Sequence, residues 1–121
     1  MDGGWQLICA LNSNLVGTVT VSVGTNAGSH LIKKGIGICT LQLSVIIPEG
    51  FTSWNDQKIA TVSFLPQNGA MRNIVLFSTS TGNSIKGRIN INGSGDVYLY
   101  ITDLIPSGGV TIQETITYIA K

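Results

Sequence analysis

The sequence has little charge. Only 11% of its 121 residues are Asp, Glu, Lys or Arg, and the formal net charge is +1, whereas an ordinary soluble domain has about 25% charged residues. No cluster of Lys and Arg is present, so we expect no nucleic-acid partner. Because Ser, Thr, Asn and Gly replace the missing charge, we expect part of the surface to be buried against other copies of the chain.

Long apolar runs are also lacking. The run Val45–Ile47 ends at Pro48 and is far shorter than the roughly 18 residues that a membrane-spanning helix needs. No positive region precedes the apolar residues 5–11, which argues against a signal peptide. We therefore expect no membrane insertion, and we interpret residues 1–4 as a junction or an expression remnant.

Cysteine and histidine are scarce. Cys9, Cys39 and His30 are the only residues of these two types. Cysteines in alternating apolar segments predict buried free thiols, although a disulfide between the two stays possible. One histidine and two distant cysteines cannot complete a zinc shell, so we expect no metal and no other cofactor.

What the sequence does contain is a hydrophobic period of two. Apolar and polar residues alternate over residues 18–23, 38–47, 88–92, 97–101 and 112–119, which indicates half-buried strands. Turn residues separate these segments, and Asn92–Asp96 predicts a hairpin. We predict a single all-β domain over residues 1–121, a compact antiparallel β-barrel or sandwich of roughly eight or nine strands. The last strand should tie the C-terminus into the sheet.

The segment 51–58 combines an aromatic residue with polar neighbours. Trp54 stands beside Asn55 and Asp56. Such a set suits a sugar, because an aromatic ring packs against the C–H face of a pyranose while polar groups bind its hydroxyls. The alternative is that Trp54 covers one end of the core and its neighbours only hold a turn.

Other residues are candidates for ligand contacts. The guanidinium of Arg72 suits a phosphate or carboxylate, unless Arg72 is a solvated residue at the start of a strand. His30 lies beside a turn of Gly and Ser and is either a ligand contact or a plain loop-edge residue. Tyr98 and Tyr100 share one strand face, where they form a buried pair, line a groove or contact another subunit.

Catalytic motifs are absent. A Ser-His-Asp triad would depend on His30 as its only imidazole, and no Gly-x-Ser-x-Gly sequence occurs. Glu49 and Asp56 could form a glycosidase pair only if the fold set their separation, which the sequence does not indicate. We therefore expect a protein that is not an enzyme.

The order of the predicted elements is informative. Along the chain come a basic turn at Lys33-Lys34-Gly35, a long alternating strand, a loop, a strand ending in Leu65-Pro66, a Gly-rich hairpin within Lys86–Val97, and a last strand closing on Thr117-Tyr118-Ile119. From about Leu15 to its end, the chain resembles the receptor-binding head domain of tail proteins from phages of Gram-positive bacteria. One departure is that Leu65-Pro66 is not followed by a second proline.

The resemblance implies a compact antiparallel β-barrel at the tip of a trimeric baseplate or tail-fibre protein. Such heads are not catalytic and bind host cell-wall saccharides, including teichoic-acid-like glycans, near protomer interfaces. They use Trp, His, Asp and Arg, which are matched in type by Trp54, His30, Asp56 and Arg72. The resemblance also implies a homotrimer, contacts with other baseplate proteins, and a place in the virion after synthesis in the host cytoplasm.

Other functions fit the sequence less closely. The main alternative is a structural domain that trimerises or caps a phage fibre without a ligand pocket. A tail-associated glycan hydrolase would need a carboxylate pair or a His-centred triad. A monomeric lectin-like domain from a bacterium would share the sugar-binding mechanism.

Overall fold

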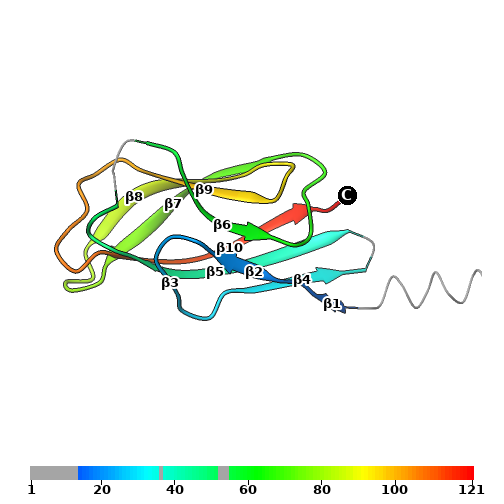
Figure 1. The fold of residues 1–121 in the computed structure, drawn as a ribbon, viewed down its shortest axis with the longest axis horizontal. Coiled ribbons are helices and arrows are strands. Elements are labelled where there is room, and N and C mark those ends of the chain that lie inside the picture. Colours follow the sequence, from blue (N-terminus) through cyan, green and yellow to red (C-terminus); the bar gives the residue numbers. More distant parts are fainter. Residues whose placement is uncertain (1–13, 36, 52–54) are drawn as a thin grey trace, which may run out of the picture.

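The computed structural model describes residues 14–35, 37–51 and 55–121, in which every regular element is a β-strand (Figure 1). The strands are β1 (Asn14–Val16), β2 (Val19–Val21), β3 (Thr25–Asn26), β4 (His30–Lys34), β5 (Ile38–Ile47), β6 (Gln57–Val62), β7 (Ala70–Ser78), β8 (Ser84–Ile91), β9 (Asp96–Ile101) and β10 (Val110–Ile119). The predicted all-β fold is confirmed. The described residues form ten strands rather than eight or nine, because β1 and β3 are too short to show an alternation.

The strands form one curled antiparallel sheet in the order β1-β4-β5-β10-β7-β8-β9-β6-β2, with β3 beside β5. β5 and β10 pair over ten residues, whereas β10 pairs with β7 only at Val110↔Ser78 and Thr111↔Phe77. The sheet turns over along this short contact. As a result, β3, β4 and β5 lie on one side of the molecule and β7, β8 and β9 on the other (Figure 1).

The core lies inside the curl, where the alternation placed it. On β5 the inward residues run from Cys39 to Ile47 in steps of two, and none is more than 1% exposed. Val97, Leu99 and Ile101 of β9 are also fully buried. Each such aliphatic side chain stabilises the fold by about 1.5–3 kcal/mol relative to an exposed one.

One chain segment joins the two ends of the sheet. Within residues 14–21, β1 pairs with β4 and β2 pairs with β6, and the Gly17 N–H donates to the carbonyl oxygen of Leu31 at 2.8 Å. A Cβ on Gly17 would lie 2.7 Å from Leu31 Cδ2 and 2.8 Å from Phe64 Cε2. Glycine therefore allows the close approach that closes the curl.

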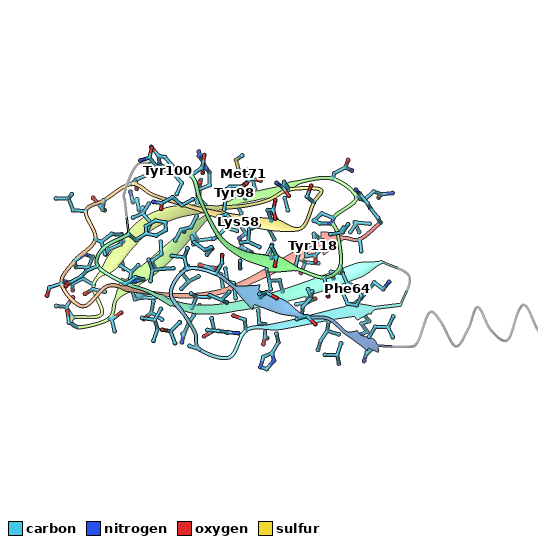
Figure 2. All side chains as sticks on the ribbon, viewed as in Figure 1. Lys58, Phe64, Met71, Tyr98, Tyr100 and Tyr118 are labelled. Carbon is cyan, nitrogen blue, oxygen red and sulfur yellow. The ribbon has the colours of Figure 1, made fainter. Side chains whose placement is uncertain are left out.

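Tyr118 links β10 to the segment that follows β6 through a hydrogen bond. Its side chain is buried, and its hydroxyl donates to the carbonyl oxygen of Phe64 at 2.6 Å; Figure 2 shows the two residues near one end of the barrel. Burial, and after it the neighbouring Cys39 thiol, raises the pKa of the phenol, while burial raises the pKa of Cys39. Cys39 is a buried free thiol as predicted, and Cys9 lies outside the described residues.

The C-terminal end is held by the backbone. The N–H of Ala120 donates to the Gly37 carbonyl at 2.6 Å, and the N–H of Lys121 donates to the Leu65 carbonyl at 2.8 Å. The Asn92 N–H donates to the Asp96 carbonyl at 3.0 Å, which closes the turn between β8 and β9. Both the predicted hairpin and the predicted tie of the last strand are confirmed.

Replacing Tyr118 with Phe should lower the free energy of unfolding by about 1 kcal/mol, because the partly buried carbonyl oxygen of Phe64 loses its donor. Urea denaturation followed by circular dichroism measures the change. Tyr98→Phe is the matched control, since the Tyr98 phenol lies half-buried on the outer surface and its loss should cost less than about 0.5 kcal/mol. Equal losses of stability in the two variants would contradict a stabilising hydrogen bond between Tyr118 and Phe64.

Candidate functional site

Two tyrosines lie on the outer face of β9. Tyr98 and Tyr100 alternate with the buried Val97, Leu99 and Ile101, and both are half-buried. Figure 2 shows them on the side of the molecule formed by β7, β8 and β9. The buried aromatic pair, one of the three predictions for these residues, is wrong, because the alternation turns both rings away from the core.

The register of the hairpin sets an arginine beside the second tyrosine. Arg88 of β8 is directly opposite Tyr100, as Asn90 is opposite Tyr98, and side chains at directly opposed positions share one face of the sheet. The Arg88 guanidinium carbon lies 4.8 Å from the centre of the Tyr100 ring, within the range of a cation–π contact. An aromatic surface and a cation therefore stand side by side.

The Arg88 guanidinium is only weakly engaged by other protein groups. Its Nη2 lies 3.5 Å from both carboxylate oxygens of Asp56, a long separation for a charge-assisted hydrogen bond. Its Nε is buried and has no hydrogen-bond partner within residues 14–35, 37–51 and 55–121. Since the ion pair is half-exposed and weak, an anionic ligand can compete with Asp56 for this guanidinium.

A hollow of about 630 Å³ adjoins these residues. Its lining includes Arg88, Tyr100, Lys86, Asn73 and Thr102, with Arg72 and Glu114 at the side of β10. In the described part of the chain Lys86 has no ion-pair partner. Three cationic side chains and one carboxylate thus line a hollow that also offers an aromatic ring, an amide and a hydroxyl.

Arg72 lies where β7 and β10 diverge. Its Nη1 donates to the carbonyl oxygen of Thr115 at 2.6 Å, and its Nη2 is 3.7 Å from Glu114 Oε2. Glu114 Oε1 in turn accepts from the Val75 N–H at 3.3 Å. The two side chains replace the backbone ladder that β7 and β10 lack here, so Arg72 links the strands and also lines the hollow.

The other predicted site residues do not meet in one place. Asp56 joins Arg88, and Asn55 beside it is exposed, while Trp54 lies outside the described residues. His30 is on the other layer, in a separate hollow of about 340 Å³ with Gln42 and Thr115 among its lining residues. The fold therefore places Arg72 in the lining of the hollow beside Tyr100 and Asp56 next to Arg88, and it leaves His30 apart.

His30 is positioned by a local irregularity between β3 and β4. The side-chain oxygen of Asn26 accepts the N–H groups of Gly28 and Ser29 at 3.2 and 2.8 Å. The Ser29 hydroxyl bonds to both the carbonyl and the N–H of Ser44. The chain can then resume its pairing with β5 at His30↔Gln42, which turns the imidazole outward.

Three residues that line the hollow were not predicted from the sequence: Arg88, Lys86 and Asn73. The signal that could have found the first two was the hairpin itself. Once the turn at Asn92–Asp96 is placed, counting residues outward from it along both strands pairs Arg88 with Tyr100 on the outer face. Asn73 could not be found this way, because a long connection separates its strand from the hairpin.

The described residues contain no group of three or more His, Cys, Asp or Glu side chains that could hold a metal ion. Within the same residues, no helix has the length and apolar character needed to cross a membrane.

Comparisons of this chain with protein-family models, with curated proteins and with solved structures found no match.

Replacing Arg72 with Ala should lower the free energy of unfolding by about 1 kcal/mol. The variant removes the short bond to Thr115 and leaves Glu114 without its cation, but the side chain is half-exposed, so solvent screening limits the loss. Lys86→Ala removes the same charge from the same hollow and should change stability by less than about 0.5 kcal/mol. Chemical denaturation compares the two, and an equal loss would argue against the strand-linking role of Arg72.

Proposed function

We propose that this chain is a non-catalytic, saccharide-binding head domain, and that the hollow beside Tyr100 and Arg88 is its binding site. The observation that carries the proposal is the outward placement of an aromatic ring beside a weakly paired arginine. A tyrosine ring packs against the apolar face of a pyranose, and the surrounding Asn73 and Thr102 supply hydrogen-bonding groups for hydroxyls.

The charges of the hollow favour an anionic saccharide. Arg72 already donates a short hydrogen bond to the carbonyl oxygen of Thr115, so Arg88 and Lys86 are the cations available to a ligand. A guanidinium and an ammonium that line the same hollow suit the phosphate or carboxylate groups of a substituted glycan. A teichoic-acid-like polymer of alternating polyol and phosphate presents such groups at every repeat.

The wider assignment rests on the resemblance in the order of strands and turns. We propose the receptor-binding head of a phage tail or baseplate protein, acting as a homotrimer in the virion beside other baseplate proteins. Several weak sites on one trimer would engage a repetitive cell surface together, which raises the overall affinity well above that of one site. A capping or trimerisation domain without a ligand is the competing function, and it predicts no glycan binding.

Replacing Tyr100 with Ala should weaken binding of a purified, glucose-substituted poly(glycerol phosphate) teichoic acid about fivefold, because loss of the aromatic contact with the sugar ring costs on the order of 1 kcal/mol. Tyr100→Phe should retain most of the affinity, since it keeps the ring. Isothermal titration calorimetry measures both. The control is Asn68→Ala, an exposed change in the segment between β6 and β7 that should leave binding as it is.

Replacing Arg88 with Gln should weaken binding of the same polymer and also flatten the dependence of affinity on NaCl, since one screened charge contact is lost. A neutral dextran serves as the comparison ligand and should bind weakly with no salt dependence. If the unaltered chain binds neither polymer, or if Tyr100→Ala and Arg88→Gln bind as well as the unaltered chain, this site does not have the proposed function.

A further inference from the structure

The outer face of β1, β4, β5 and β10 is almost free of charge. Along these four strands, all of them fully described, Lys34 is the only charged side chain at an outward position. The outward positions of β6, β8 and β9, in contrast, carry Lys58, Lys86, Arg88 and Asp96. The outward positions of β7 are also uncharged, but they lie beside Lys86 and Arg88 of β8. The face of β1, β4, β5 and β10 is thus the larger continuous area that is almost free of charge, and depletion of charge is typical of the centre of a protein–protein interface.

One half of this face carries four exposed aliphatic side chains, with Lys34, Thr40 and Thr117 among them. Val16 is 85% exposed and pairs with Ile32, which is 42% exposed; Ile38 and Ile119 pair with each other and are 51% and 52% exposed. These four side chains lie on adjacent strands of a single face. A group of exposed aliphatic side chains of this kind marks an interaction surface on a monomer.

The other half is polar but neutral. His30, Gln42 and Thr115 lie in one row across β4, β5 and β10, with Gln113 farther along β10, and all four are exposed. Amides and hydroxyls both donate and accept hydrogen bonds, so such a surface can pair with an identical one. A patch of one charge would instead repel its own copy. This chemistry selects a second copy of the same chain as the partner.

We propose that copies of this chain associate through the outer face of β1, β4, β5 and β10. Four strands about 4.8 Å apart, with ten residues at about 3.4 Å each in the longest, span at most about 650 Å². This area is somewhat below the roughly 800 Å² that each partner contributes to a standard stable interface, so the association is moderate. The face leaves the hollow at Tyr100, on the opposite layer, open to solvent.

The inference rests on the function proposed above only in that copies of the chain associate. Pairing of identical faces joins copies two at a time, and the homotrimer proposed above would in addition need a contact between two different surfaces. The location of the interface rests on the distribution of charge and does not depend on saccharide binding. Mass measurements in the absence of glycan therefore test the interface separately from the binding site.

The test is sedimentation equilibrium of the full chain at about 1 µM to about 1 mM, a range that covers weak to moderate dissociation constants. Ile32→Lys places a charge on the proposed interface, and Val75→Lys is the matched control. Both residues are β-branched strand residues with nearly equal exposure, 42% and 43%, but Val75 is on β7 in the opposite layer. Val16→Lys, at the most exposed position, is a second interface variant that keeps the test valid if Ile32→Lys does not fold.

The expected result is reversible association of the unaltered chain, weakened about tenfold or more by Ile32→Lys and by Val16→Lys because like charges then meet across the interface. Val75→Lys should change the association less than about twofold. A chain that stays monomeric over the whole range overturns the inference and leaves the face to a different protein or to residues 1–13. If Val75→Lys weakens the association as much as the interface variants do, the inference is also overturned. A dimer that only Ile32→Lys and Val16→Lys weaken would support the interface and contradict only the homotrimer proposed above.

Discussion

The ten-residue pairing of β5 with β10 is the constraint on which the rest of the structure depends. It fixes which residues of both strands face the core, and therefore which face outward to build the neutral layer. Because β10 then pairs with β7 at only two positions, the sheet has to turn over beside it. The curl of the sheet and the gap that Arg72 and Glu114 bridge both follow from this geometry.

Much of the fold could be predicted because the relevant information is local. The alternation of Cys39–Ile47 and of Val97–Ile101 determines burial residue by residue, and a Gly-rich turn determines its own hairpin. Whether an outward residue is covered by another segment of the chain depends on residues far away in the sequence. For this reason Tyr98 and Tyr100 could be assigned to one face from the sequence, but not to an open surface.

The candidate site shows the same limit. The contact of Arg72 with Thr115 joins residues far apart in the chain, and nothing near Arg72 in the sequence indicates that a carboxylate will approach it. Asp56 was recognised by its neighbours in the loop, whereas its structural partner is Arg88 on a different strand. Residue type suggested which chemistry was available, and only the strand order determined which groups meet.

The late position of β10 in the chain has a consequence for biosynthesis. β5 gains its neighbour β4 from the adjacent sequence, but its other edge is unpaired until β10 has left the ribosome. Contacts between such distant segments give the fold a high contact order, which is typical of domains that fold in milliseconds to seconds. During synthesis the nascent chain therefore exposes the unpaired backbone groups along one edge of β5, together with the apolar side chains of its inward face. This strand is then the most prone to aggregation until β10 pairs with it.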